Sequence, residues 1–507
     1  MMAETKSKED KLEKIPFEQA LDKTGFGLYS FQLIALTGLV IIASACVMYG
    51  STIIVPTSAC ELPTTTSQKG LLVASPVVGG ILGAVMWGYL GDLYGRKRML
   101  QASLALGVVI YAAASLSVNW IMLMVLQFGA SIMAAGQYGL SMTMLSECVP
   151  LARRNIALLL VASIFLLSQG LMAALAIPII PLKFSFYLET LGIYWNSWRT
   201  TVLVYCVPSL FSLCWYSLVS ESPKFVFAKG QEDEALNILR KMHRINQGKR
   251  AKFEVYGLLP EATTTEKLGT KDKLLPLFRR PLLKFTLIIC SLYMLQHIGV
   301  FVLWLPMISD QVIRLLQTGE GMNMTLCGMI NAGLNAPPDL DAAPCALNVT
   351  ALLFVFGIAG LQSLMNIIMS IFINRAGRRN TAMALTSLCG LCGILVNVVS
   401  SAVASLALFA AFLLGLLVLG LYAAIAVAVF PTHLRATAVS FAVATGRLFT
   451  FATVQILNLM LVNNCEAGFY LFASLFALSA VILAFLPDDR LVVQQQVKKE
   501  DSILDDN

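Results

Sequence analysis

Hydrophobic residues gather in long, uninterrupted runs along this chain, and polar residues gather between them. A helix needs about 20 apolar residues to cross the hydrocarbon core of a bilayer, which is close to the length of each run. A soluble helical bundle is the alternative, but it would need charged outer faces, which these runs lack. The pattern therefore predicts an all-α membrane protein with twelve transmembrane helices, at 31–55, 70–91, 99–117, 119–145, 155–180, 199–219, 282–307, 350–373, 380–400, 403–430, 437–462 and 466–486.

The composition supports a membrane protein and indicates its orientation. Of the 507 residues, 57% are hydrophobic and 13% are charged, whereas a soluble protein carries roughly twice that charged fraction. Most of the 36 Lys and Arg residues fall on the cytoplasmic side if the N-terminus is inside, as basic residues prefer. We therefore interpret the net charge of +7 as a topology signal and predict no nucleic-acid partner. Both termini should be cytoplasmic, and the first 25 residues contain no apolar core of a cleavable signal peptide.

Two long polar segments divide the chain. One separates the first six runs from the last six, and its stretch 230–245 has an apolar face typical of an amphipathic helix on the membrane surface. The other, 309–349, lies outside the cell or in a lumen. The expected parts are a cytoplasmic tail, a six-helix half, a cytoplasmic linker, a second six-helix half and a cytoplasmic tail, at 1–30, 31–219, 220–281, 282–486 and 487–507.

The outer segment carries glycosylation and disulfide signals. Asn323 and Asn348 each begin an N-x-[ST] sequon, and Asn323 is farther from the next run, so a glycosylating enzyme would reach it more easily. Four of the eleven cysteines fall outside, and they allow three pairings. Because Cys327 and Cys345 share one loop, we expect that pair; the other two outer cysteines are Cys60 and Cys465.

The two halves repeat a short motif. The sequence GYLGDLYGRK at 88–97 aligns with SIFINRAGRR at 370–379, and each copy follows the second run of its half. A second match joins PLARR at 150–154 to PTHLR at 431–435, each after the fourth run. Duplicated six-helix halves are typical of secondary transporters, which bind substrate near the midplane between the repeats.

These motifs resemble those of a known family. The stretch 88–98 resembles the loop signature of the major facilitator superfamily, G-x-L-x-D-x-x-G-R-[KR]. Glu147, Pro150 and Arg154 resemble the E-x-x-P-x-x-x-R motif of its sugar and organic-ion porters, and ESPKF at 221–225 resembles their signature after the sixth helix. The resemblance implies the major facilitator fold, with two pseudo-symmetric six-helix halves, and transport by alternating access.

Within that superfamily the chain is most similar to the synaptic vesicle glycoprotein 2 group and its insect-type relatives. The residues that carry this resemblance are GFGLYSFQL at 25–33, NSWR at 196–199 and FPTHLRATAVS at 430–440, together with the outer loop. That group is near the organic ion transporters.

The motif of the first half suggests a gate at the inner ends of the helices. Arg96 can form a two-pronged bond to a carboxylate, for which Glu147 is the best candidate. Asp92 should lie near the N-terminus of the eleventh helix, where a carboxylate is favoured, and Gly95 permits the tight turn. The alternative is that the basic residues only fix topology. The expected network in this half is Asp92, Gly95, Arg96, Lys97, Glu147 and Arg154.

Small residues should allow the gate helices to approach closely. Gly79, Gly83 and Gly88 are spaced for close packing, and Ala436, Ser440 and Ala444 of the eleventh run should face them.

The second half departs from the motif. Asn374 replaces the aspartate, and Ala428 stands where the glutamate stands in the first half. The basic residues of this half, Arg378, Arg379 and Arg435, thus lose their local acids, and we expect Glu221 to partner one of them. The inner gate should therefore be stronger in the first half.

Ionisable residues inside the runs mark a candidate substrate cavity, since such residues are costly and usually functional. Arg447 lies near the middle of the eleventh run; its alternative is a snorkelling arginine near the inner end. His297 lies in the seventh run, which lines the cavity in this superfamily; its alternative is a hydrogen-bonded packing role. The other polar candidates, which could instead join helices by hydrogen bonds, are Gln169, Gln296, Gln362 and Asn366.

The first run lacks the acid that related porters often carry there, so an anionic or neutral substrate is favoured and a coupling ion is left open. We expect a functional monomer in the plasma membrane or a vesicle membrane that transports small organic solutes. A transport-silent membrane glycoprotein is the alternative. The sequence contains no nucleotide-binding loop or metal-ligand cluster, so no enzyme activity, metal or cofactor is expected.

Overall fold

The computed structural model describes residues 14–248, 250, 252–259, 275–319, 321–335, 346–431 and 434–487. These residues are mostly helical, and every predicted run falls on one or more helices. The first half contains α3 (Leu28–Met48), α4 (Ser51–Ser58), α5 (Thr66–Tyr94), α6 (Arg96–Ala114), α7 (Trp120–Cys148), α8 (Leu151–Ala176) and α9 (Ser197–Tyr216). The second half contains α13 (Leu282–Met294), α14 (Ile298–Thr318), α15 (Leu326–Asn335), α16 (Val349–Ala376), α17 (Arg378–Leu395), α18 (Ala402–Leu413), η2 (Leu414–Leu417), α19 (Val418–Val429), α20 (Arg435–Asn463) and α21 (Cys465–Ala484).

Nine helical segments among the described residues are long and apolar enough to cross a membrane. They cover nine of the twelve predicted runs, and the chain is a multi-pass integral membrane protein. Helices α6, α9 and α17 occupy the other three runs, and α6 and α17 each begin with basic residues. Twelve spans stay a prediction for those three helices.

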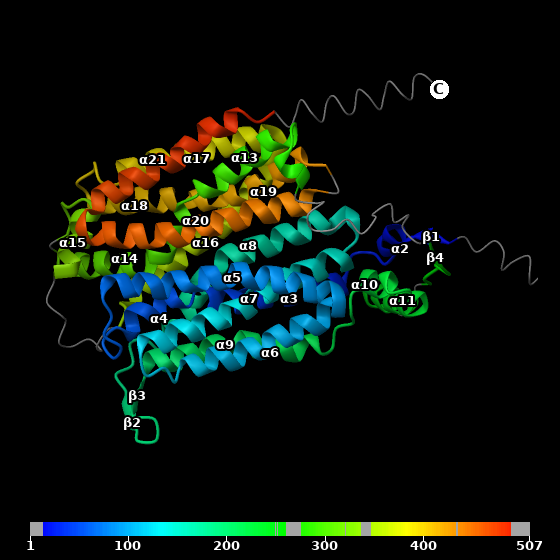
Figure 1. The fold of residues 1–507 in the computed structure, drawn as a ribbon, viewed down its shortest axis with the longest axis horizontal. Helices are drawn as coiled ribbons and strands as arrows, with labels where there is room; N and C mark the ends of the chain where they lie inside the picture. The colour runs from blue at the N-terminus through cyan, green and yellow to red at the C-terminus, as the bar shows by residue number, and fades with distance from the viewer. Residues whose placement is uncertain are drawn as a thin grey trace, which may run out of the picture.

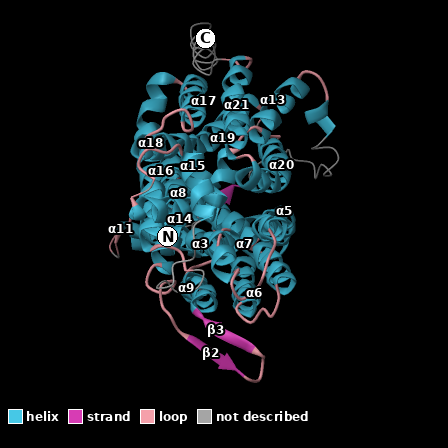
Figure 2. Ribbon diagram, turned by 90° about the vertical axis from the view of Figure 1, so that its left-hand side faces the viewer, coloured by secondary structure: helices cyan, strands magenta, loops and turns pink. Residues whose placement is uncertain are grey.

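The helices form two groups that lie side by side with their axes roughly parallel (Figure 1). Helix α5 packs mainly on α7 within the first half and on α20 of the second half. Helix α8 packs on α16 and α4 packs on α14, so these contacts also join the halves. Seen from the outer end of the helices, the two groups lie one above the other (Figure 2).

The repeated motif forms the same turn in both halves. Gly95 separates α5 from α6 with φ of +105°, and Gly377 separates α16 from α17 with φ of +79°. Both angles lie in the region that favours glycine, since a Cβ there would clash with the backbone. The prediction that Gly95 makes a tight turn is confirmed, and the internal repeat is visible in the backbone.

A small layer lies at the end of the first half that the charge distribution predicts to be cytoplasmic. It contains β1 (Ile15–Pro16), α2 (Phe17–Lys23), α10 (Pro223–Ala228), α11 (Glu232–Gln247) and β4 (Leu258–Leu259), with η1 (Leu275–Phe278) following in the chain. β1 pairs with β4 in parallel. Helix α11 is the predicted amphipathic helix, and it buries Ala235, Leu239 and Met242. The segment before the first span is thus held against the linker.

The outer side contains a β-hairpin that the sequence did not predict. Strand β2 (Ser185–Leu188) pairs with β3 (Ile193–Asn196) in antiparallel register. The fifth and sixth predicted runs end at 180 and begin at 199, and no structure was predicted between them. Each strand has only four residues, too few for an alternation of apolar and polar positions to be recognised in the sequence.

The expected disulfide is wrong. Cys327 at the start of α15 pairs with Cys465 at the start of α21, with their Cα atoms 5.6 Å apart. Helix α15 packs against α20 and α21, which brings Cys327 to a cysteine that is distant in sequence. Cys345, its expected partner, lies outside the described residues, and Cys60 is also in a disulfide.

Candidate functional site

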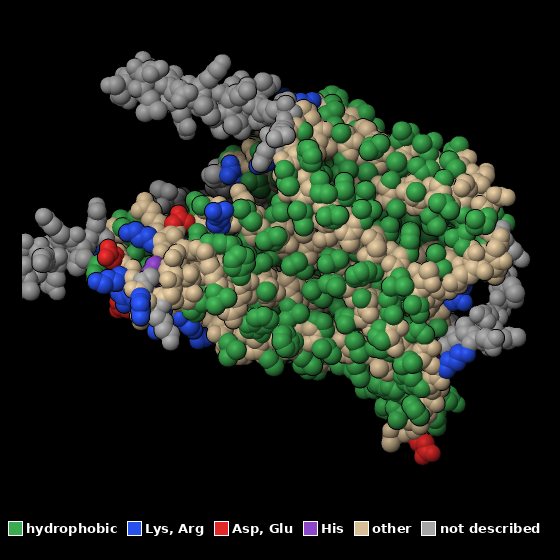
Figure 3. Space-filling model, turned by 180° about the vertical axis from the view of Figure 1, so that it is seen from behind, with side chains coloured by type: hydrophobic (Ala, Val, Ile, Leu, Met, Phe, Trp, Pro, Cys, Tyr) green, Lys and Arg blue, Asp and Glu red, His purple; other side chains and the backbone are tan. Residues whose placement is uncertain are grey.

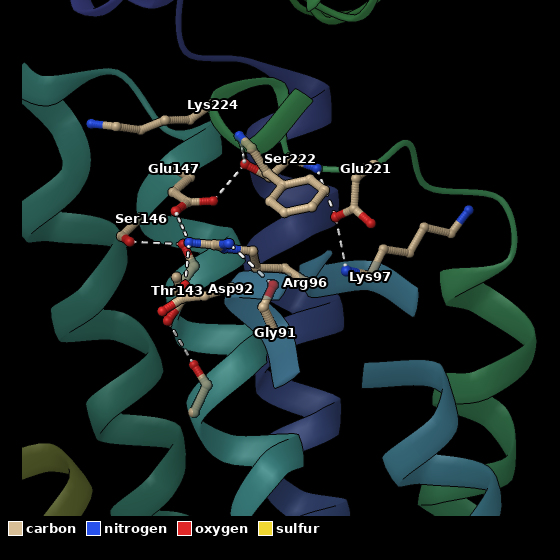
Figure 4. Close-up of polar contacts among 12 residues, drawn as sticks. Gly91, Asp92, Arg96, Lys97, Thr143, Ser146, Glu147, Glu221, Ser222 and Lys224 are labelled. Carbon is tan, nitrogen blue, oxygen red and sulfur yellow. Dashed lines mark hydrogen bonds and ion pairs between the residues drawn. The ribbon is translucent and has the colours of Figure 1, made fainter. Parts of the chain in front are cut away.

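Arg96 is the centre of a polar network at the inner end of the first half (Figure 4). Its guanidinium lies 2.9 Å from the Asp92 carboxylate and 3.2 Å from that of Glu147. It also donates to the Gly91 carbonyl and lies over the Phe225 ring. The side chains of Arg96 and Glu147 are 15% and 13% exposed, whereas that of Asp92 is 73% exposed. The Arg96–Glu147 pair is therefore the sheltered one, as a salt bridge is stronger where water is excluded.

Two residues at the start of the linker contact this network. The Ser222 hydroxyl donates to Glu147, and the side chain of Ser222 also caps α10. Glu221 accepts hydrogen bonds from the backbone N–H groups of Lys97 and Ser222. A carboxylate at the start of α6 is favoured because the free N–H groups there carry partial positive charge.

This placement corrects one expectation. Glu221 was expected to partner an arginine of the second half, but its carboxylate binds the start of α6 in the first half. It also lies close to Gly95, where it leaves little room for a side chain.

Arg154 receives its acid from a segment that the motif did not indicate. Glu18 of α2 lies 2.9 Å from Arg154 and 3.2 Å from Lys224. Partial burial raises the pKa of Glu18, but the hydrogen bonds and charges of Arg154 and Lys224 outweigh it, so the net pKa is lowered. Asp22 of the same helix accepts from the Leu151 backbone at the start of α8. Helix α2 thus supplies two acids to the inner end of α8.

In the second half, backbone carbonyls accept from the motif arginines. Arg378 donates to the Ala424 carbonyl, and Arg435 donates to the Phe430 carbonyl at 2.9 Å. Arg379 donates to carbonyls at the end of α21. Arg154 has the same type of contact, to the Val149 carbonyl. The side chain of Asn374 lies outside the described residues.

The small residues of α5 face a different helix from the one expected. Gly79 and Gly83 pack against Phe128, Ser131 and Ile132 of α7 rather than against α20. Gly88 has open space where a Cβ would lie. Ala436, one of the expected partners, has its side chain outside the described residues.

Arg447 lies at the interface between the halves. It is twelve residues into the 29-residue helix α20, about 18 Å from the inner end of that helix. Its guanidinium donates to the Gly80 carbonyl of α5 at 3.3 Å. A cation of the second half therefore contacts the backbone of the first half.

His297 is enclosed by aromatic rings. Its side chain lies at the break between α13 and α14, is 1% exposed, and has its ring 5.0 Å from that of Phe472 and 5.7 Å from that of Phe449. This environment fits a packing role better than a role in a wet cavity.

The four polar candidates form hydrogen bonds between helices. Gln296 and Gln362 donate to backbone carbonyls in the η2 region within the second half. Gln169 donates to the Val302 carbonyl, and Asn366 donates to the Ser163 hydroxyl, so both connect the halves. Hydrogen bonds of this kind hold membrane helices together.

Among the described residues, hydrogen bonds join the halves at the middle and at the outer end. Besides those of Gln169, Asn366 and Arg447, Asn458 donates to the Thr66 carbonyl at 2.6 Å and Gln455 to the Ser67 carbonyl at 3.5 Å. These last two join the outer ends of α5 and α20. The halves are therefore held together on the outer side in this conformation.

A second buried cluster at the outer end was not foreseen. Arg199 is 0% exposed and pairs with Glu61, which is 19% exposed. The Glu61 carboxylate also accepts from Trp198 and Asn196, and the Arg199 guanidinium lies over the Trp198 ring. No pattern in the sequence pairs Arg199 with Glu61, because the two residues are 138 positions apart.

The two sequons differ in their surroundings. Asn323 is exposed in the outer loop. Asn348 accepts from the Thr350 backbone at the start of α16 and donates to Gln317. Asn323 is therefore the more accessible acceptor, although glycosylation at either stays a prediction.

Comparisons with known proteins agree with the motifs. The family described as Major Facilitator Superfamily matches residues 38–338. Mouse synaptic vesicle glycoprotein 2B is 28% identical over 248 residues, which cover 48% of this chain and 36% of that protein. Rat synaptic vesicle glycoprotein 2A is 26% identical over 231 residues, which cover 45% of this chain and 31% of that protein. The match thus spans about a third of the length of these relatives.

Solved structures show the same fold. The partially occluded, inward-open xylose transporter XylE from E. coli superposes with a TM-score of 0.64 over 91% of this chain and 100% of that chain, at 16% identity. A D-xylose–proton symporter superposes with a TM-score of 0.62 at 15% identity, over 92% of this chain and 99% of that chain. Identities this low support the fold and say nothing of the substrate.

Proposed function

Because the chain belongs to the major facilitator superfamily, we propose that it is a secondary or facilitative transporter of small organic solutes that works by alternating access. The observation that carries this proposal is a set of hydrogen bonds that joins the halves at the outer ends of their helices. Hydrogen bonds join α5 to α20 at their outer ends, through Asn458 and Gln455. In an alternating-access protein such contacts close one side while the site opens to the other.

The substrate class follows from Arg447. A guanidinium in the middle of a membrane helix is costly unless it faces water, a partner or a substrate. Arg447 makes its hydrogen bond across the interface between the halves, to a carbonyl that carries no formal charge. The first span, Leu28–Ser58, contains no Asp or Glu. An anionic organic solute would supply a negative charge for Arg447.

The direct test is uptake into proteoliposomes, with a panel of radiolabelled organic anions, cations and sugars. We expect uptake of an organic anion or a neutral solute. Arg447→Ala should abolish anion uptake, and Arg447→Lys should retain part of it, because lysine keeps the charge but loses the two-pronged geometry. Arg314→Ala is the matched control, since Arg314 lies near the outer side and pairs with Asp310. Arg447→Ala with unchanged anion uptake would contradict this substrate class.

Alternating access itself can be tested with cysteine pairs. Ser67→Cys with Gln455→Cys should cross-link in the conformation described here, since these residues are in contact. Gly88→Cys with Ser440→Cys should cross-link in the opposite state, and Gly88 has room for the new side chain. If the outer pair forms fully and the inner pair never does, with or without solutes, the protein does not alternate.

A transport-silent membrane glycoprotein is the second candidate. The observation that favours it is the similarity to synaptic vesicle glycoproteins 2A and 2B. The polar residues of the spans also agree with it, because Gln169, Gln362 and Asn366 already have partners. Absent uptake across the panel, together with an unchanging cross-linking pattern in folded protein, would favour this candidate.

A further inference from the structure

The β2–β3 hairpin extends sideways from the outer end of the first half. It connects α8 to α9 and extends beyond the edge of the helix bundle, below α9 and α6 (Figures 1 and 2). The helix axes run roughly horizontally in Figure 1, and the hairpin is displaced vertically in both views. The hairpin is therefore displaced sideways from the bundle, at the level of the outer helix ends. In a bilayer this position lies over or within the outer leaflet next to the bundle.

Both faces of the hairpin are apolar or aromatic. Tyr187 pairs with Tyr194 on one face, with their rings 5.0 Å apart. Phe186 pairs with Trp195 on the other face. Phe186, Tyr187 and Tyr194 are 64%, 55% and 53% exposed. In water, this much exposed aromatic surface on a two-stranded sheet would be unfavourable and prone to association.

The base of the hairpin is fixed by the outer cluster. Arg199 donates to the Tyr194 carbonyl at 3.0 Å, and Asn196 donates to Glu61. Trp195 donates from its indole N–H to Thr200 on α9. Strand β3 runs directly into α9 without a linker. The direction of the hairpin is therefore set by buried contacts, so its exposed aromatic residues are held at one depth relative to α9.

We propose that the β2–β3 hairpin is an anchor that lies in the outer lipid–water interface of the bilayer. Its apolar surface continues that of α9, on which Leu203, Val207 and Phe211 are exposed where the bundle meets lipid. Figure 3 shows hydrophobic side chains covering both the flank of the bundle and the projecting hairpin. Tyrosine and tryptophan, with a polar group on an apolar ring, are the residues that prefer this interface.

The charges agree with a lipid partner. Along residues 182–195 only Lys183 and Glu189 are charged, and Glu189 lies in the turn. A protein partner that added a strand to the hairpin would have to reach it within the lipid region, because the hairpin lies beside the bundle and not above it. The lipid surface is already present at that position.

The test places a fluorescent label on the hairpin in liposomes. Cys214 and Cys392 are replaced by alanine, because the other free cysteines of the described residues are buried. NBD is then attached at Tyr187→Cys or Phe186→Cys, which lie on opposite faces, and at Met322→Cys, an outer-loop position that is 55% exposed. Quenching is measured with a lipid that carries a nitroxide near its headgroup and with iodide in solution.

We expect the hairpin labels to emit at shorter wavelength than the label at 322, to lose emission with the nitroxide lipid and to resist iodide. Quenching by lipid on one face alone also supports the proposal, with the hairpin lying flat on the membrane. Iodide quenching at both hairpin positions that equals that at 322 would overturn it. Protection from both quenchers would overturn it in favour of a protein partner. None of these results depends on transport activity.

Discussion

Replacing Glu147 by glutamine should destabilise the inner end of the first half much more than replacing Asp92 by asparagine. Both carboxylates pair with Arg96, at 3.2 Å and 2.9 Å. The side chain of Glu147 is 13% exposed and that of Asp92 is 73% exposed. The shorter contact is therefore expected to be the weaker one, because water screens it.

The magnitude follows from the geometry. At an effective dielectric constant near 20, opposite charges 3.2 Å apart attract by about 5 kcal/mol. Desolvation and ordering offset most of this attraction, and a hydrogen bond to a charged group contributes about 1.5–3 kcal/mol net. Glutamine retains an acceptor for Arg96 and for Ser222, so we expect a loss of about 1–2 kcal/mol for Glu147→Gln. For Asp92→Asn we expect about 0.5 kcal/mol or less.

Buried thiols provide the assay. Cys46, Cys148, Cys206, Cys290 and Cys389 are free and buried, so a thiol-reactive dye reports unfolding of detergent-solubilised protein. The midpoint of thermal unfolding should fall clearly for Glu147→Gln and stay close to that of the parent for Asp92→Asn.

Salt provides a second readout. Raising the ionic strength should reduce the difference in unfolding midpoint between Asp92→Asn and the parent. It should leave most of the difference between Glu147→Gln and the parent, since buried pairs are screened less. Equal losses for the two variants would refute the conclusion that burial decides the strength of these pairs.

Three further predictions concern other sites. Glu18→Gln should destabilise the protein at neutral pH. Because the pKa of Glu18 is lowered from 4.5, its stabilisation is present above pH 4.5 and is lost as the pH falls below that value. The thermal unfolding midpoints of variant and parent should therefore converge in acid. Glu61→Ala should lower the free energy of unfolding by about 3 kcal/mol, since it leaves Arg199 buried beside neutral groups. A double variant, Glu61→Leu with Arg199→Leu, removes both charges, and its unfolding at a lower temperature than Glu61→Ala would contradict this reasoning. Asn323→Gln should remove a glycan-dependent shift in gel mobility in a glycosylating cell, whereas loss of the other sequon should not.

The sequence predicted the fold because its signals are local. Apolar runs of membrane length and two copies of one motif are visible in the sequence alone. The pairing of Arg96 with Glu147 was also predictable, because both residues belong to motifs whose arrangement the family resemblance implied.

The remaining contacts could not be predicted because they join residues that are far apart in the sequence and carry no shared pattern. Glu18 reaches Arg154 across 136 residues, and Glu61 reaches Arg199 across 138. A single acid in a tail or at a helix end is not distinguishable by pattern from a solvated one. The expected cysteine pair was wrong for the same reason, since Cys327 and Cys465 are 138 residues apart.

Among the described contacts, the motif arginines of the two halves differ in chemistry. In the first half Arg96 and Arg154 face carboxylates, and in the second Arg379 and Arg435 donate to backbone carbonyls. A carboxylate loses its charge in acid, whereas a backbone carbonyl at a helix end keeps its partial charge at any pH. Acid should therefore weaken the contacts of Arg96 and Arg154 before those of Arg379 and Arg435. The described acids of the first-half cluster come from α2, α5, α7 and the start of the linker, so α2, the start of the linker and the first half should loosen together.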